Sequence, residues 1–346
     1  MVFILACFLF TPCYAYEGSG EYNFEGKGFE QILAEFMEQN GLNENNFSFG
    51  WYDTRDGQLQ FYNGDLYMKA ASMYKLPLCM EYQTRLSDGR LSPDDTIMGL
   101  KIGDAMYMSI VYSNNEISVA LRDALGVDHA TYRLMLASYS CIPAEELPGS
   151  FFTDNYMSPR LIMGILMTLH EESELYAPVI ELMKQGTPDM FFRKYQEEYE
   201  IAHKYGSFEG MLNDCGIVYT PNPFMLVAFT KHVPNANHVL GGICDLFTQY
   251  SLYIDEQETI AAAEEARLEE ERREAEEAKA DGLKAASYEI EQPEAEKPEA
   301  ERTETESLPE TEGNEARQRI FVCGAVALFL GGSAAVCVFR RKKRKS

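Results

Sequence analysis

The chain has 346 residues, with 30 lysines and arginines against 55 aspartates and glutamates and a formal net charge of −25. So acidic a composition disfavours nucleic-acid binding, because basic residues cluster only at the end of the chain. The eight cysteines include no C-x-x-C pair, so the sequence indicates neither a zinc site nor a redox motif. We therefore expect no metal and no cofactor.

Residues 1–15 form an apolar run that ends in Cys13, Tyr14 and Ala15. An apolar segment with a small residue at its end is typical of a signal peptide, so we expect the rest of the chain to be exported. The run lacks the positive residues that usually precede such a segment. A buried N-terminal strand is the alternative.

Hydrophobic periodicity predicts helices and strands between residues 28 and 254, which we expect to form one folded domain. Its first half should hold a helix over 28–40, a hairpin with strands at 46–52 and 59–62, and helices over 116–125 and from Ser158 onward. Its second half should hold strands at 200–207, 216–220 and 225–230 and a helix over 237–254. This order predicts an α+β fold, in which strands from both chain ends form an antiparallel sheet beside an all-helical lobe. We expect the site in the groove between them.

The most informative motif is Ser-x-x-Lys, formed by Ser72 and Lys75 at the start of an apolar helix. Residues three apart share one helical face, so the hydroxyl and the ammonium should come together. A serine hydroxyl is a poor nucleophile until a base takes its proton, and a desolvated lysine can be that base. A lone motif of this length is common by chance, with a helix-capping serine and a surface lysine as the alternatives.

Two further motifs follow in order: Ser113-Asn114-Asn115, and Lys204-Tyr205-Gly206-Ser207 at the start of a strand. Together the three resemble the S-x-x-K, S-D-N and K-T-G motifs of the penicillin-recognising serine enzymes, and most closely the class A β-lactamases. The resemblance covers residues 25–255, including flanking sequence at 213–219. It implies the β-lactamase/DD-peptidase-like fold.

The resemblance also implies a role for each matching residue. Ser72 would be the nucleophile and Lys75 its base, and Ser113 would pass a proton to the leaving nitrogen. Asn115 would hold the substrate amide, and Lys204 would supply positive charge for a substrate carboxylate.

The last motif implies further substrate contacts. The backbone N–H groups of Ser72 and Ser207 would form the oxyanion hole, beside Gly206. Tyr205 stands where the family has threonine, which removes the short hydroxyl that contacts the carboxylate. Asn114 stands where class A enzymes have aspartate.

The largest departure precedes Ser158. Class A enzymes carry Glu-x-x-Leu-Asn there, and that glutamate activates the water that hydrolyses the acyl-enzyme. Alignment on Leu147 places Ala144 at the glutamate position, so Glu145 or Glu146 is the candidate deacylation base. Without a positioned base the acyl-enzyme should form and hydrolyse slowly.

The C-terminal quarter changes character. Residues 256–281 predict a charged helix or a weak coiled coil, and residues 282–319 a disordered stalk rich in proline, glutamate and threonine. Residues 320–339 carry no charge and are long enough to span a bilayer. The basic residues in 340–346 should keep that end in the cytoplasm, which predicts a single-pass C-terminal anchor.

Residues 308–313 read Leu-Pro-Glu-Thr-Glu-Gly and resemble a sortase signal, with Glu312 where glycine is expected. A sortase that cleaves at Thr311 would indicate a Gram-positive envelope. A plain membrane anchor is the alternative. Either way we expect the domain on the extracellular face of the membrane or in the cell wall.

These observations predict an exported serine hydrolase that forms an acyl-enzyme with β-lactams or with D-Ala-D-Ala-like stem peptides of peptidoglycan. It would be a β-lactamase or a DD-peptidase. The alternative is a catalytically weak module that binds or senses penicillin or wall peptides.

Overall fold

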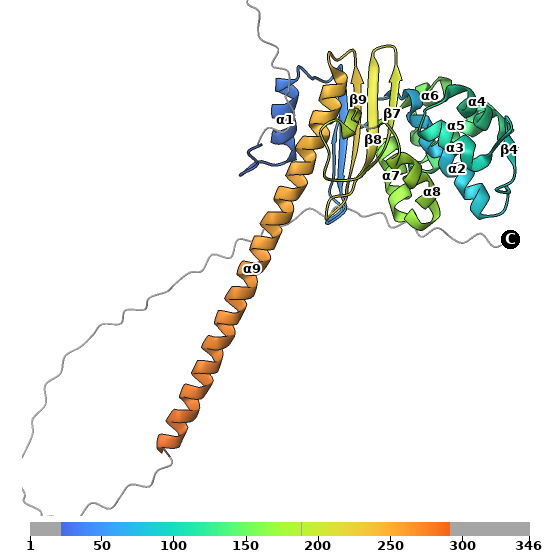
Figure 1. Ribbon diagram of the computed structural model, residues 1–346. Coiled ribbons are helices and arrows are strands. Elements are labelled where there is room, and N and C mark those ends of the chain that lie inside the picture. The colour runs from blue at the N-terminus through green and yellow to red at the C-terminus, as the bar shows by residue number, and fades with distance from the viewer. Residues whose placement is uncertain (1–21, 188, 291–346) are drawn as a thin grey trace, which may run out of the picture. The chain divides into compact units, whose positions relative to one another are not determined.

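A five-stranded antiparallel sheet lies at the centre of the computed structural model, which describes residues 22–187 and 189–290 (Figure 1). Its strand order is β2-β1-β9-β8-β7. The strands are β1 (Phe47–Asp53), β2 (Leu59–Tyr62), β7 (Ile201–Phe208), β8 (Met211–Val218) and β9 (Phe224–Lys231). β1 pairs with β9 in the register Phe49↔Ala228, which joins the two ends of the domain. The predicted α+β fold with a sheet from both chain ends is therefore confirmed.

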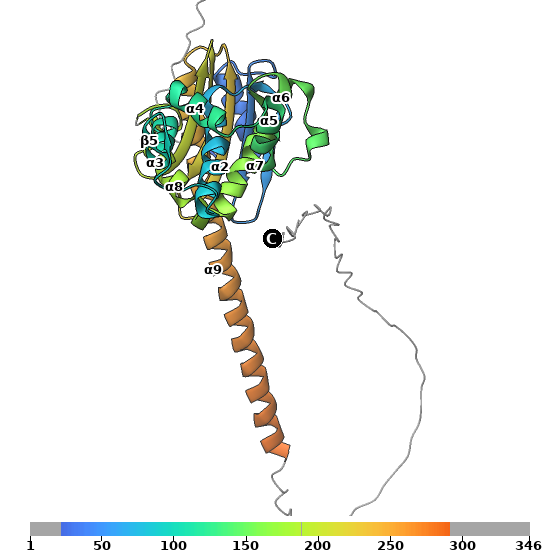
Figure 2. The same ribbon diagram turned by 90° about the vertical axis from the view of Figure 1, so that its right-hand side faces the viewer.

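Helices cover both faces of this sheet (Figures 1 and 2). On one face lie α1 (Phe29–Gln39) and the first turns of α9 (Ala236–Ile290), near the expected positions. Phe29 packs against Trp51 and Phe247 with ring centroids 6.0 and 5.6 Å apart. Because both faces are covered, β9 is buried along its length except at Lys231, and it reads as a continuous apolar run.

The other face carries a helical lobe (Figure 2). Its helices are α2 (Lys75–Ser87), α3 (Ile102–Ile110), α4 (Asn115–Ala124), α5 (His129–Ser138), α6 (Gly149–Thr153), α7 (Pro159–Glu171) and α8 (Ser173–Lys184). Two short pairs of strands join them, β3 (Met68–Lys69) with β6 (Tyr156–Met157) and β4 (Thr96–Ile97) with β5 (Leu100–Lys101). These two strand pairs were not predicted, because strands of two residues leave no periodic signal in the sequence.

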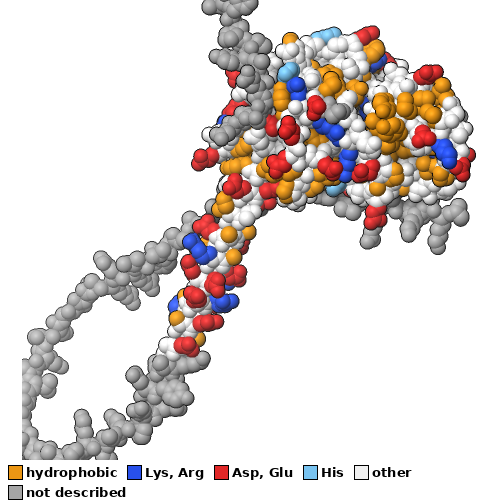
Figure 3. All heavy atoms as spheres, viewed as in Figure 1, with side chains coloured by type: hydrophobic (Ala, Val, Ile, Leu, Met, Phe, Trp, Pro, Cys, Tyr) orange, Lys and Arg blue, Asp and Glu red, His pale blue; other side chains and the backbone are white. Residues whose placement is uncertain are grey.

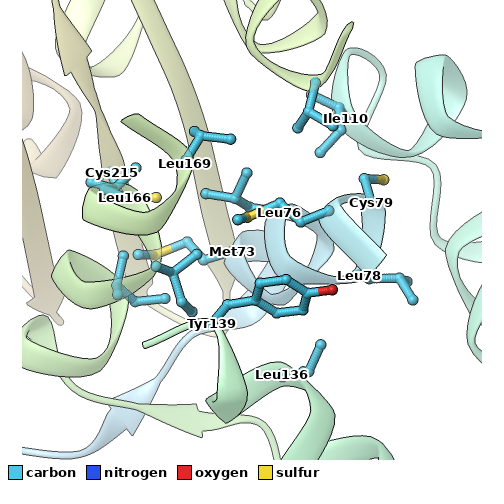
Figure 4. Packing of buried hydrophobic residues seen from close by; sticks show 14 of the residues in the cluster. Met73, Leu76, Leu78, Cys79, Ile110, Leu136, Tyr139, Leu166, Leu169 and Cys215 are labelled. Carbon is cyan, nitrogen blue, oxygen red and sulfur yellow. The ribbon is translucent and has the colours of Figure 1, made fainter. Parts of the chain in front are cut away.

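Helix α2 lies in the middle of the hydrophobic core of the lobe. Leu76, Leu78 and Cys79 are completely buried, and α3, α5 and α7 contribute the side chains that surround them (Figure 4). Burial of its first two turns on every side explains why residues 76–80 form a continuous apolar run rather than an amphipathic pattern. It also fixes the position of the turn that precedes the helix.

Strand β8 begins earlier than the predicted range 216–220. Its first half contains Asn213 and Asp214, which are buried and polar. The Asn213 amide donates to the Lys69 carbonyl at 2.9 Å, and Asp214 accepts from the His203 ring at 2.8 Å. Because these buried residues are polar, they interrupt the hydrophobic pattern, and the start of the strand was not predicted from the sequence.

Helix α9 continues without a break through the predicted boundary at residue 255. It includes the charged segment 256–281 and runs to Ile290, so the prediction of disorder was wrong for residues 282–290. The charged part is exposed, and acidic and basic side chains are interspersed along it (Figure 3). Pairs three or four residues apart, such as Arg267 with Glu264 and Glu271, support the helix.

The remaining terminal predictions fall outside the described residues. These are the signal segment 1–15, the rest of the stalk, the sortase-like residues 308–313, the span 320–339 and the basic tail. Within residues 22–187 and 189–290, none of the helices combines the length and the apolar character needed to cross a bilayer.

Candidate active site

Ser72 lies in a 3-10 helix, η1 (Ala71–Tyr74), that leads directly into α2. The preceding Ala71 has φ +49°, a left-handed conformation that is costly for a residue with a side chain. Asn155 holds this turn from two sides. Its side-chain amide donates to the Ala71 carbonyl, and its own carbonyl accepts from the Ala70 N–H at 2.9 Å. Asn155 therefore fixes the backbone that presents Ser72.

Lys75 is completely buried at the first turn of α2. Its ammonium donates to the Ser113 carbonyl at 2.6 Å, to the Asn115 side-chain carbonyl at 2.8 Å and to the Ser113 hydroxyl at 3.2 Å. It forms no ion pair with a carboxylate of the described chain. Burial lowers the pKa of Lys75 to about 8, so both its charged and neutral forms are accessible near neutral pH.

The Ser113-Asn114-Asn115 segment reaches Lys75 through a tight turn. Ser113 has φ +51°, and Asn114 caps α4 by accepting from the Ile117 N–H at 2.9 Å. Asn114, the middle residue of the motif, is thus the N-cap of α4. Its neighbours Ser113 and Asn115 both contact Lys75.

Lys204 approaches the same place from β7 and is 1% exposed. Its ammonium donates to the Ser113 hydroxyl at 3.1 Å and to the Tyr205 carbonyl at 2.8 Å. Burial, together with the nearby Lys75, lowers the pKa of Lys204 to about 7. Three motifs that are far apart in the sequence therefore meet around one hydroxyl group.

Gly206 allows β7 to pass directly beside the nucleophile turn. A Cβ atom at this position would lie 2.3 Å from the Ala70 carbonyl oxygen and 3.0 Å from the Ser72 backbone nitrogen. Only glycine permits this approach, which brings the strand backbone next to the Ser72 N–H. Ser207 follows as an exposed residue of the same strand. The strand that carries Ser207 therefore passes directly beside the turn that carries Ser72.

Tyr205 lies against Lys204, with its ring centroid 4.3 Å from the Lys204 ammonium. The candidate deacylation bases lie elsewhere. Glu145 and Glu146 belong to the 3-10 helix η2 (Ala144–Glu146), and both are exposed. The described structure gives neither carboxylate a hydrogen bond or ion pair with Ser72, Lys75 or Ser113.

Asn155 has no counterpart among the residues singled out from the sequence. It lies 83 positions after Ser72 in the chain, and nothing in its neighbourhood forms a recognisable motif. The one available signal was the Ser158-Pro159 helix start, which places residue 155 in the segment just before a helix. Contact with Ala71 becomes visible only when β3 and β6 are paired.

The chain belongs to the β-lactamase enzyme family, because residues 28–250 match the family model of that description. A search of curated proteins gives no match. Among solved structures, a variant of the reconstructed last common ancestor of Gram-negative class A β-lactamases is similar at 19% identity, with a TM-score of 0.56. The alignment covers 65% of this chain and 98% of that one.

Two β-lactamases from living organisms are similar to this chain in structure, again at low sequence identity. The enzyme from Chitinophaga pinensis is 19% identical, with a TM-score of 0.54 over 64% of this chain and 98% of that one. The enzyme from Sphaerobacter thermophilus is 18% identical, with a TM-score of 0.54 over 66% and 98%. Likeness at this level of identity establishes the class A β-lactamase fold.

Proposed function

We propose that this chain is a serine hydrolase that forms an acyl-enzyme on Ser72 with β-lactams or with D-Ala-D-Ala-like peptides. The observation that carries the proposal is the meeting of Lys75 and Lys204 at the Ser113 hydroxyl, beside the turn that presents Ser72. Two buried lysines around a serine, without a described carboxylate partner, are costly for stability. Such a cost is typical of a site selected for proton transfer.

The proposed reaction begins when neutral Lys75 takes the proton of the Ser72 hydroxyl. The Ser72 oxygen bonds to the carbonyl carbon, and the negative oxygen that forms is stabilised by the Ser72 and Ser207 N–H groups. The C–N bond then breaks, and the leaving nitrogen receives a proton from the Ser113 hydroxyl. Ser113 is reprotonated by the ammonium of Lys75, to which the first proton had moved.

Hydrolysis of the acyl-enzyme would be the slow step. It needs a water molecule and a base, and Glu145 and Glu146 are exposed on η2, where the described structure gives neither a hydrogen bond or ion pair with Ser72, Lys75 or Ser113. A slow second step favours a DD-peptidase or a penicillin-binding sensor over an efficient β-lactamase. The same observation supports the second candidate function, a module that is acylated once and then signals or holds its ligand.

We further propose that the domain acts outside the cytoplasm, on the extracellular face of the membrane or in the cell wall of a Gram-positive organism. The support is in the sequence: the apolar run 1–15, the uncharged span 320–339 with its basic tail, and the sortase-like residues around Thr311. Protease treatment of intact cells should remove the domain. A domain protected from protease until the cells are lysed would contradict external placement.

The experiment that tests the enzymatic proposal is a pulse-chase with a fluorescent penicillin. Wild-type protein and Ser72→Ala are labelled briefly, excess unlabelled penicillin is added, and the covalent label is followed on denaturing gels. Label on the wild type alone that persists for hours supports a peptidase or sensor. Label that disappears within seconds, with product released, would indicate a β-lactamase, and no label on the wild type would contradict acylation of Ser72 by β-lactams and favour a binding module.

A further inference from the structure

Tyr205 and Phe191 form an aromatic pair beside Lys204. Their ring centroids are 4.4 Å apart with an interplanar angle of 19°, so the rings are stacked. The Tyr205 ring in turn lies 4.3 Å from the Lys204 ammonium, within the range of a cation–π contact. An aromatic pair thus lies within contact distance of the ammonium.

The hydrogen-bonding capacity of Lys204 is used within the protein. An ammonium has three N–H groups. One bonds the Ser113 hydroxyl and one the Tyr205 carbonyl, and the centroid of the Tyr205 ring lies 4.3 Å from the same ammonium. Lys204 is only 1% exposed. A substrate carboxylate therefore finds no free donor on Lys204 while the ring stays in place.

The aromatic pair is held rigidly from the Phe191 side. Phe191 begins the 3-10 helix η3 (Phe191–Arg193) with φ +57°, an outlier for a bulky residue. Its N–H donates to the Asn237 side chain at 2.6 Å, and the next N–H, of Phe192, donates to Asp214 at 3.1 Å. Phe191 is 4% exposed. The surrounding structure thus maintains a strained backbone whose effect is to place Phe191 against Tyr205.

We propose that Tyr205 is a specificity-determining residue that closes Lys204 to substrate anions. The site would then select substrates that carry no carboxylate next to the scissile bond, such as a D-alanyl amide inside a longer cross-linked peptide. The inference rests on the proposed acyl-enzyme function and deepens it. It replaces the carboxylate contact that the family resemblance implies for Lys204.

The test compares acylation of the protein by benzylpenicillin and by benzylpenicillin methyl ester. The two compounds share the reactive ring and differ in the carboxylate. Wild-type protein should show second-order acylation rates for the two that are alike. Tyr205→Thr should raise the free-acid to ester ratio by roughly tenfold or more, because a charge-assisted hydrogen bond to the uncovered Lys204 becomes available.

Two further variants make the result specific. Tyr205→Phe keeps the ring and should keep the wild-type ratio. Tyr62→Thr removes a partly buried tyrosine that packs on the same core from the opposite edge strand, so it controls for lost packing. A wild-type protein that already prefers the free acid tenfold, or an unchanged ratio in Tyr205→Thr, would overturn the inference alone. Absence of an adduct with both compounds would overturn the proposed function and the inference with it.

Discussion

Lys75 and Lys204 donate to the same oxygen atom, the Ser113 hydroxyl, at 3.2 and 3.1 Å. Both ammonium groups are buried, and neither has an ion pair with a carboxylate in the described part of the chain. Each charge raises the cost of the other, and burial raises the cost of both. Over part of the physiological pH range, therefore, one of the two lysines should be protonated and the other neutral.

This relationship predicts the pH dependence of acylation. The pKa values of Lys204 and Lys75 are lowered to about 7 and about 8, and they belong to the pair rather than to either residue. The reactive form needs a neutral Lys75 beside a charged Lys204. A plot of the acylation rate against pH should therefore be bell-shaped, with its maximum between about pH 7 and 8. Rates measured from pH 5 to 10 check this.

The control for that profile is Lys101→Met, which removes an exposed lysine that forms an ion pair with Asp94. This variant should have the same pH dependence of the acylation rate as the wild type. A wild-type rate that stays constant from pH 5 to 10 would show that the two buried lysines do not take part in acylation.

A second prediction concerns stability. Burial lowers the pKa of Lys75 from 10.5 to about 8, so the unfolded chain binds this proton more tightly than the folded one. The resulting loss of folding stability is at its full value below pH 8 and decreases as pH rises toward 10.5. Relative to wild type, Lys75→Met should therefore gain most in melting temperature at low pH, and the gain should shrink toward pH 10.

Thermal unfolding of both proteins from pH 6 to 10 measures this difference. The variant also leaves the Asn115 carbonyl without its donor, which is a cost that does not change with pH. The pH dependence of the difference, rather than its sign at one pH, is the test. A difference that is constant or that grows with pH would contradict the lowered pKa.

The features that the sequence predicted share a local signal. Ser72 with Lys75 lie within one turn, and β1 and β2 flank an Asp-Gly turn, so spacing alone indicated them. Features that depend on long-range pairing were missed. Asn155 reaches Ala71 only through the β3–β6 pair, Tyr205 meets Phe191 only because η3 has a strained start, and the buried polar residues Asn213 and Asp214 concealed the start of β8.

A third prediction tests the role of Asn155 in positioning the nucleophile. Asn155→Ala removes the donor to the Ala71 carbonyl and frees the strained turn before Ser72. Loss of such a partly buried hydrogen bond costs roughly 1–3 kcal/mol. The acylation rate should fall by roughly tenfold or more, and labelling at a saturating penicillin concentration should still reach completion.

The matched control is Asn63→Ala. The Asn63 side chain also donates to backbone carbonyls, those of Glu44 and Phe47, and lies at the β2 end of the sheet. It should lose stability without losing acylation rate. If the two variants lower the rate equally, Asn155 contributes only to general stability.

A fourth prediction concerns the close approach of β7. In Gly206→Ala the new methyl group would lie 2.3 Å from the Ala70 carbonyl, which forces the strand and the η1 turn apart. Acylation should be lost, because the Ser72 and Ser207 N–H groups could no longer donate to the same substrate oxygen. Gly103→Ala, at an exposed position of α3 with nothing within 4 Å of its added Cβ, should label like wild type. Labelling of Gly206→Ala at the wild-type rate would contradict the proposed oxyanion hole.

The measurement that tests the central claim most directly is peptide mapping of penicillin-labelled protein by mass spectrometry. We predict that the added mass falls on Ser72 in the wild type and that Ser72→Ala carries no adduct, while both proteins melt cooperatively. An adduct on another residue, or an equal adduct on Ser72→Ala, would contradict the account, since it would show that the three motifs do not converge on Ser72 as the nucleophile.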